Sequence, residues 1–335
     1  MLTTVFAVIG FLSIALYVGP LLFQTIFFNV QNLKKKYNAQ WALVTGGSSG
    51  IGLAMSETLA SQGINVVVAA LNDKAMESAK VSLPRKFPGI QFRFVSVNLG
   101  AHDPTVYMTP LIEATNDISV QLVFNNAGYI LVGLFHLTSL EAIMSCLNCN
   151  NIAAVQITHH FTGRLVAESQ KGAVFFTSSP GGFMASPMAP LYSTTKSFLT
   201  NFAVSIAAEL TPNNIDVCVI HPSPTNTAFY NGAGNMSTLT TFQKLSGSPQ
   251  AIVDAALRCI GRTVNVEHGW YTVGNRLLLK ILDYTVMSDL MWVFVRGQGD
   301  YEKIRVGQLE KLGGKTVGSV TARGGVVASK AVKGQ

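Results

Sequence analysis

The sequence Trp41-Ala-Leu-Val-Thr-Gly-Gly-Ser-Ser-Gly-Ile-Gly52 joins a short apolar run to a glycine-rich turn. We expect a buried strand over Ala42–Val44 and a helix over roughly Ile51–Ser61. One glycine permits a tight turn, the next lets the backbone approach a pyrophosphate, and the last lets helix and strand pack closely. The helix N-terminus suits a phosphate anion. The G-x3-G-x-G spacing differs from the commoner G-x-G-x2-G, so a plain strand-to-helix turn is the alternative to dinucleotide binding.

Further apolar runs of strand length recur along the chain, and helical stretches alternate with them. This alternation is the pattern of an α/β fold with a doubly wound parallel sheet. No internal repeat competes with a single domain, which we place at residues 38–275. The runs are Ile64–Ala70, Phe92–Val97, Val120–Phe124, Ala173–Thr177 and Ile215–Ile220.

A tyrosine and a lysine four residues apart point to proton transfer. Tyr192 and Lys196 lie on one face of a helix, one turn apart. A phenol with a pKa of about 10 is a poor acid–base group at neutral pH, and a nearby ammonium lowers that pKa. Ser179, after the strand that ends near Thr177, can donate a hydrogen bond to a substrate oxygen. An amphipathic helix with a surface lysine is the alternative, but with Ser179 we favour a hydride-transfer site.

Taken together, these segments resemble the short-chain dehydrogenase/reductase family, from Trp41 to about Arg262. The resemblance implies a Rossmann-type sheet and an NAD(P)-dependent oxidoreductase that interconverts CH–OH and C=O. It further implies that Lys196 holds the nicotinamide ribose and that Asn150 kinks a helix to support a water-linked proton relay. The catalytic residues implied are Asn150, Ser179, Tyr192 and Lys196.

The family resemblance also implies a set of cofactor-binding residues. Asn125-Asn-Ala-Gly128 follows a strand and lines the adenine and ribose side of the cofactor in the family, although a polar turn is the simpler alternative. The full set is Thr45, Gly46, Ser48, Ser49, Gly50, Ile51, Gly52, Leu71, Asn72, Lys74, Asn98, Asn126, Ala127, Gly128, Tyr192, Lys196, Pro222, Thr225 and Thr227.

Several positions depart from the family pattern. Members that prefer NAD carry an acidic residue where this chain has Ala70, and members that prefer NADP often place an arginine where it has Leu71. Without a carboxylate there is no repulsion against a 2′-phosphate, so we expect NADP(H) to be preferred, with NAD(H) left open. Asn98 replaces a usual aspartate, and the usual Pro-Gly after the sixth strand reads Pro222-Ser223-Pro224 here.

The N-terminal segment Met1–Asn32 contains no charged residue. About 20 apolar residues span a bilayer, so we expect a transmembrane anchor over residues 1–33. A signal peptide would have a basic start. Lys34–Lys36 follow at once, which predicts that the catalytic domain faces the cytosol. Gly19-Pro20 leaves a kinked helix or a hairpin in one leaflet as alternatives. The anchor and the family suggest the endoplasmic reticulum, without an address signal.

A second hydrophobic stretch, Leu277–Val295, is interrupted by Lys280, Asp283 and Asp289. It is poor for spanning but suits a helix on a membrane surface or a lid over an apolar pocket. Burial against the domain or a dimer partner is the alternative, and a homodimer is one option. We therefore expect a membrane-associated extension over residues 276–312, followed by a flexible tail over residues 313–335.

The net charge of +7, on a chain only 12% charged, favours contact with anionic headgroups or an anionic substrate such as an acyl-CoA. No nucleic-acid motif is present.

Four cysteines indicate no disulfide framework. Cys146-x2-Cys149, with His159-His160 downstream, superficially resembles a zinc site, but no second cysteine pair follows and we expect no metal. We place His136 and His221 near the pocket mouth, in structural roles.

The sequence thus predicts a membrane-anchored oxidoreductase for a lipophilic ketone or secondary alcohol, of 3-oxoacyl-CoA, ketosphingoid or steroid type. The layout of an anchor followed by a domain is similar to that of 3-oxoacyl-CoA reductases, 3-ketosphinganine reductases, and hydroxysteroid or retinol dehydrogenases. The alternative from another class is a non-catalytic nucleotide-binding membrane protein that regulates a lipid-metabolism partner. The intact catalytic residues argue against it, and Ala70, Leu71, Asn98 and Ser223 keep it open.

Overall fold

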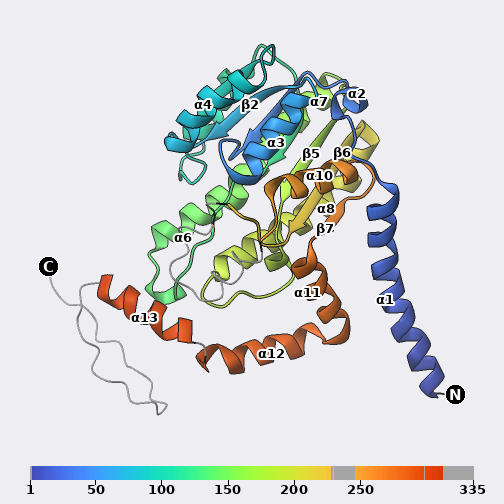
Figure 1. Ribbon diagram of the computed structural model, residues 1–335. Helices are drawn as coiled ribbons and strands as arrows, with labels where there is room; N and C mark the ends of the chain where they lie inside the picture. Colours follow the sequence, from blue (N-terminus) through green and yellow to red (C-terminus); the bar gives the residue numbers. More distant parts are fainter. Residues whose placement is uncertain (1, 228, 230–245, 298, 312–335) are drawn as a thin grey trace.

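The computed structural model describes residues 2–227, 229, 246–297 and 299–311. At its centre lies a parallel seven-stranded sheet with the strand order β3-β2-β1-β4-β5-β6-β7. Helices cover both faces (Figure 1). The predicted doubly wound, Rossmann-type α/β fold is confirmed. The order reverses after β1, where the chain crosses to β4, and such a switch point is where open α/β sheets bind ligands.

All six predicted apolar runs form strands. A seventh strand was not predicted, because only one of its four residues, Val266, is apolar. The strands are β1 (Trp41–Thr45), β2 (Asn65–Ala70), β3 (Phe92–Ser96), β4 (Val120–Asn125), β5 (Gly172–Thr177), β6 (Ile215–Pro222) and β7 (Asn265–His268).

The helices of the domain alternate with these strands. Several begin at side-chain caps: Asp73 accepts a hydrogen bond from the Met76 N–H, and Ser248 from the Ala251 N–H. The domain helices are α2 (Leu33–Tyr37), α3 (Gly50–Ser61), α4 (Lys74–Lys86), α5 (Thr105–Glu113), α6 (Leu140–Leu147), α7 (Ala153–Ala167), α8 (Pro190–Leu210) and α10 (Pro249–Cys259).

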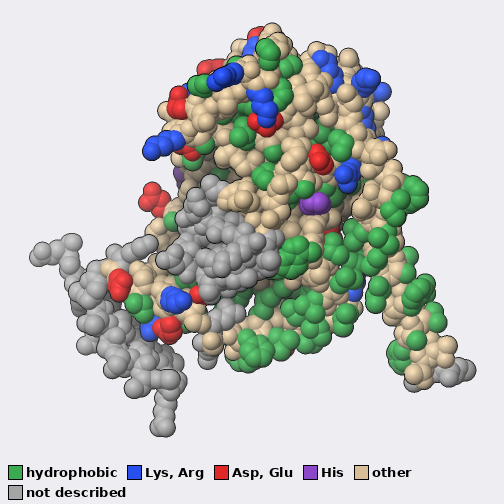
Figure 2. Space-filling view, viewed as in Figure 1, with side chains coloured by type: hydrophobic (Ala, Val, Ile, Leu, Met, Phe, Trp, Pro, Cys, Tyr) green, Lys and Arg blue, Asp and Glu red, His purple; other side chains and the backbone are tan. Residues whose placement is uncertain are grey.

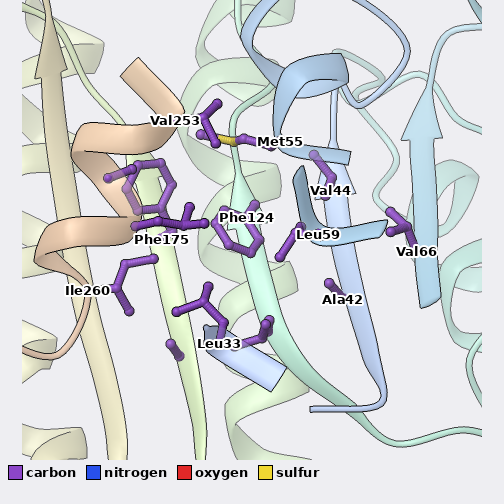
Figure 3. Packing of buried hydrophobic residues seen from close by; sticks show 14 of the residues in the cluster. Leu33, Ala42, Val44, Met55, Leu59, Val66, Phe124, Phe175, Val253 and Ile260 are labelled. Atoms are coloured by element: carbon purple, nitrogen blue, oxygen red, sulfur yellow. The ribbon is translucent and has the colours of Figure 1, made fainter. Parts of the chain in front are cut away.

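Two hydrophobic clusters hold the helices on the sheet. Figure 3 shows one of them, in which Met55 and Leu59 of α3 and Val253 of α10 pack against Phe124 and Phe175 of the sheet. The second cluster joins the other face to α5, α7 and α8. Because both faces are covered, the strands are fixed in place, and their carboxyl ends provide a rigid edge for a binding site.

In the described part of the chain, four further helices lie outside this core: α1 (Leu2–Phe27), α11 (Trp270–Ile281), α12 (Tyr284–Phe294) and α13 (Gly299–Lys311). Within α1, Thr3–Phe27 is long and apolar enough to cross a membrane. The hydrophobic stretch Leu277–Val295 forms two helices, because Asp283 interrupts it and caps α12. The boundary expected after residue 275 falls inside α11. The tail predicted at 313–335 lies outside the described residues.

Candidate active site

A cavity of about 970 Å³ opens at the carboxyl ends of the strands. Its size is at the upper end of the range for ligand sites. Sixteen of the predicted site residues line it: Gly46, Ser48, Ser49, Gly50, Ile51, Leu71, Asn98, Asn126, Ala127, Gly128, Ser179, Tyr192, Lys196, Pro222, Thr225 and Thr227. The fold therefore gathers segments from nearly the whole domain around one space.

Hydrogen bonds to Thr45 connect the glycine turn to the Asn-Asn-Ala-Gly segment at the end of β4. Its hydroxyl oxygen accepts hydrogen bonds from the N–H groups of Asn126 and Ala127, each at 3.0 Å. The Asn126 side chain donates to the Thr45 carbonyl at 3.2 Å and accepts from the Thr177 hydroxyl at 3.0 Å. Asn126 thus bridges β1 and β5 and braces the floor of the cavity.

The glycine turn is shaped for close backbone approach. Gly46 and Gly50 have φ of 64° and 54°, where side chains are disfavoured. A Cβ at Gly52 would collide with the Gly46 carbonyl oxygen, and one at Gly50 would meet Thr227 at 3.0 Å. The first turn of α3 therefore presents its N–H groups along an open cradle, which fits the pyrophosphate of a dinucleotide.

Asn150 lies in a π-helical turn, Asn148–Ile152, between α6 and α7. Its side chain donates to the Tyr129 carbonyl at 3.0 Å and to the Thr195 hydroxyl at 3.1 Å, and it accepts from the Tyr129 N–H at 3.0 Å. The buried amide therefore joins this turn to α8 and to the loop after Gly128. Turns of this kind occur often at functional sites.

Lys196 is buried beneath the cavity, with 3% of its surface exposed. Its ammonium donates to the Thr177 carbonyl at 2.8 Å and lies 5.8 Å from the centre of the Tyr192 ring. Burial lowers the pKa of Lys196 from its ordinary 10.5 to about 8. A Cβ at Gly128 would lie 3.1 Å from the Asn150 oxygen and 3.5 Å from the Lys196 nitrogen, so both groups face the same point.

Ser179 and Tyr192 meet at Gly181. A Cβ at Gly181 would lie 3.3 Å from the Tyr192 ring and 3.6 Å from the Ser179 hydroxyl. That hydroxyl also accepts a hydrogen bond from the Gly181 N–H, which orients it. The structure thus brings together the four predicted catalytic residues, with a phenol, a hydroxyl and an ammonium at one end of the cavity.

Five predicted site residues are not on the cavity wall. Thr45, Gly52 and Asn150 lie directly behind it and hold it in shape, whereas Asn72 and Lys74 are exposed beyond the end of β2. The sequence analysis missed Asp73, whose side chain caps α4 and which lines the cavity beside Leu71. The sequence could have indicated this position, because Asp73 is the acidic residue nearest to the end of β2.

Of the histidine and cysteine residues singled out in the sequence, Cys149 lines the cavity. His221 is fully buried rather than at the pocket mouth, because its ring bonds Thr200 at 2.9 Å and Val266 at 3.2 Å. Cys146 lies in α6 and Cys149 in the π-helical turn. Within the described ranges, no group of three His, Cys, Asp or Glu side chains is placed to hold a metal ion.

The family pattern described as short chain dehydrogenase matches residues 40–237, which is more than half of the chain. The chain belongs to the short-chain dehydrogenase family. It is an NAD(P)-dependent oxidoreductase, and the non-catalytic alternative is set aside. The matched segment begins one residue before β1 and includes the glycine turn and all four predicted catalytic residues.

Its relatives include proteins named very-long-chain 3-oxoacyl-CoA reductase. The one from Eremothecium gossypii is 28% identical over 247 residues, covering 71% of this chain and 68% of that protein. The one from Candida glabrata is 26% identical over 271 residues, covering 76% and 74%.

Solved structures share the fold. A 7β-hydroxysteroid dehydrogenase has a TM-score of 0.66 at 22% identity, covering 76% of this chain and 96% of its own. A short-chain dehydrogenase from Sphingobium yanoikuyae, in complex with NADPH, has a TM-score of 0.62 at 24% identity, covering 74% and 95%.

Proposed function

We propose that this protein is a membrane-anchored reductase that converts the ketone of a long-chain 3-oxoacyl-CoA to a secondary alcohol, with NADP(H) as its preferred cofactor. The observation that carries the proposal is the convergence of Asn150, Ser179, Tyr192 and Lys196 in a chain whose relatives are named very-long-chain 3-oxoacyl-CoA reductases.

In the proposed reaction the nicotinamide cofactor, when bound, supplies the hydride that reaches the ketone carbon. The Tyr192 hydroxyl gives its proton to the ketone oxygen, and the Ser179 hydroxyl donates a hydrogen bond to the same oxygen. The Lys196 ammonium favours the phenolate that Tyr192 becomes, and it would hold the cofactor ribose. Asn150 holds the π-helical turn, through which a water-linked path would return the proton.

The residues at the end of β2 support the proposed preference for NADP(H). Leu71 is 55% exposed and lines the cavity, and neither it nor Ala70 presents a carboxylate against a 2′-phosphate. The carboxylate of Asp73 does lie nearby, but one of its oxygens is engaged by the N–H of Met76 at 2.9 Å. The Sphingobium yanoikuyae relative that binds NADPH is consistent with this choice.

Membrane anchoring and orientation belong to the same proposal. Helix α1 is apolar and exposed, and Lys34, Lys35 and Lys36 follow it at the start of the domain. Basic residues after a hydrophobic segment favour the cytosolic side. We therefore place the catalytic domain in the cytosol, at the endoplasmic reticulum.

A substrate panel tests the proposal. The full chain in detergent would be assayed for NADPH and NADH oxidation with a long-chain 3-oxoacyl-CoA, 3-ketosphinganine and a steroid ketone. We expect the 3-oxoacyl-CoA to have the highest kcat/KM, with NADPH preferred over NADH. Turnover of only the sphingoid or the steroid ketone would overturn the assigned substrate, and a preference for NADH would overturn the assigned cofactor.

A further inference from the structure

Helix α12 presents an apolar stripe to its surroundings. Val286, Leu290 and Val293 are exposed and recur at i, i+4 and i+7, so they share one face of the helix. Beside them Trp292 is 70% exposed, and Phe294 is also exposed. A helix that rests on a soluble domain normally turns polar residues outward. The outward face of α12 therefore requires an apolar neighbour.

Helix α11 continues the same surface. Its exposed side chains include Trp270, Leu278 and Ile281, which recur along one face at i, i+8 and i+11. Figure 2 shows hydrophobic side chains gathered at the lower end of the molecule, where Figure 1 places α11 and α12, and again along α1. The three helices thus expose apolar surface at one end, and exposed patches of this kind mark interaction sites.

Contacts on one side of α1 fix it to the domain. The Tyr17 hydroxyl donates to the Glu267 carboxylate, and Glu267 in turn pairs with Arg276 of α11 at 2.8 Å. The half-buried residues in the C-terminal part of α1 recur at helical spacing: Ala15, Tyr17, Val18, Leu21 and Gln24. Residues Thr3–Ile14 are exposed all round. The N-terminal half of α1 therefore projects from the domain, toward the same end as α12 (Figure 1).

These features select a lipid bilayer as the neighbour. The patch is continuous with a helix whose length and composition suit a membrane. Asp289 is the sole charged residue in the sequence of α12, and it stands beside the stripe, where an interfacial helix can keep a carboxylate in water. Exposed Trp and Tyr side chains such as Trp292 and Tyr284 favour the headgroup region.

The substrate cavity reaches the same helices from the other side. Tyr271 and Asn275 of α11 and Met291 of α12 line it, together with Ser179 and Tyr192. Met291 is half-buried, and it lies on the side of α12 away from Val286, Leu290 and Val293. One helix therefore separates the apolar surface from the cavity that holds the catalytic groups.

We propose that α11, α12 and the projecting half of α1 form one membrane-embedded surface, through which the acyl chain of the substrate passes from the bilayer into the cavity beside Met291. The acyl chain then stays in an apolar medium while its 3-oxo group reaches Tyr192. The membrane surface stands on the geometry alone, and the access route rests on the proposed function.

Fluorescence quenching tests the membrane surface. The full chain would be placed in phosphatidylcholine vesicles with or without dibrominated acyl chains, which quench tryptophan on contact. We expect strong quenching in the wild type that is largely lost in the double variant Trp270→Phe/Trp292→Phe and retained in Trp41→Phe, since Trp270 and Trp292 are exposed on the proposed surface and Trp41 lies buried in β1. Equal quenching in the wild type and in Trp270→Phe/Trp292→Phe would overturn the membrane surface.

Kinetics test the access route. The double variant Trp292→Glu/Phe294→Glu would be compared in vesicles with the matched apolar control Trp292→Leu/Phe294→Leu. We expect the acidic variant to raise KM for a long-chain 3-oxoacyl-CoA at least about tenfold, a change of about 1.4 kcal/mol. Its kcat/KM for 3-oxobutanoyl-CoA, which is short and water-soluble, should match that of the control.

An equal effect on both substrates, or on neither, would overturn the access route. A different outcome isolates the proposed function. If the quenching of the wild type depends on Trp270 and Trp292 but the protein reduces no 3-oxoacyl-CoA of either length, the substrate assignment and the access route fail, while the membrane surface is upheld.

Discussion

Replacing Lys196 by methionine should remove a specific pH dependence from the stability of the protein. The side chain is buried, and its ammonium donates a hydrogen bond to the carbonyl of Thr177 at 2.8 Å. Burial lowers the pKa of Lys196 from 10.5 to about 8. Methionine has a similar length and carries no proton, so the variant keeps the packing and loses the titration.

The magnitude follows from the size of this pKa shift. The shift is about 2.5 units, and each unit is worth about 1.4 kcal/mol, so the full effect is on the order of 3 kcal/mol. Between pH 8 and 10.5 the unfolded chain holds a proton on this lysine that the folded protein has released. The free energy of unfolding therefore rises with pH across that window, by up to about 1.4 kcal/mol per unit, and this contribution is constant below it.

The assay is urea unfolding of the cofactor-free full chain in detergent, at several pH values from 7 to 10.5. The free energy of unfolding of the wild type minus that of Lys196→Met should be flat below pH 8 and rise by about 3 kcal/mol toward pH 10.5. Lys171→Met, at an exposed position, is the matched control and should give a flat difference. A flat or falling difference for Lys196→Met would refute the reasoning that burial lowers this pKa.

Two further predictions concern the neighbouring parts of the site. Asn150→Ala removes three hydrogen bonds to the backbone of Tyr129 and the hydroxyl of Thr195. At about 1 kcal/mol each, the free energy of unfolding should fall by about 3 kcal/mol in urea titrations, and a loss below 1 kcal/mol would contradict this bonding. Leu71→Asp should lower the kcat/KM ratio of NADPH to NADH at least about tenfold, because a carboxylate repels a 2′-phosphate. An unchanged ratio would place the adenosine ribose elsewhere.

Local patterns carried most of the fold prediction. The strands around β1 were readable because a strand buried on both faces is an apolar run, as in Val66-Val67-Val68. Strand β7 was not predicted because Glu267 and His268 interrupt its apolar pattern. Pairing with β6 stabilises this strand instead. The stretch from Leu277 to Val295 was not predicted to form two separate helices, because the cap at Asp283 becomes visible only in three dimensions.

In the candidate site, too, local sequence patterns predicted some features, whereas others depend on tertiary packing. Spacing in the sequence was enough to pair Tyr192 with Lys196, since both lie on α8. It could not show that Asn150 reaches across to Tyr129 and Thr195, because those contacts depend on how three elements pack. The burial of His221 likewise depends on long-range contacts.

The central claim is that Tyr192 transfers the proton while other residues hold the cofactor. The most direct test is Tyr192→Phe, measured for NADPH binding by fluorescence and for turnover of a long-chain 3-oxoacyl-CoA. We predict that kcat falls about 10²- to 10⁴-fold while the Kd for NADPH changes less than about threefold. Turnover close to that of the wild type, with the cofactor still bound, would contradict the account.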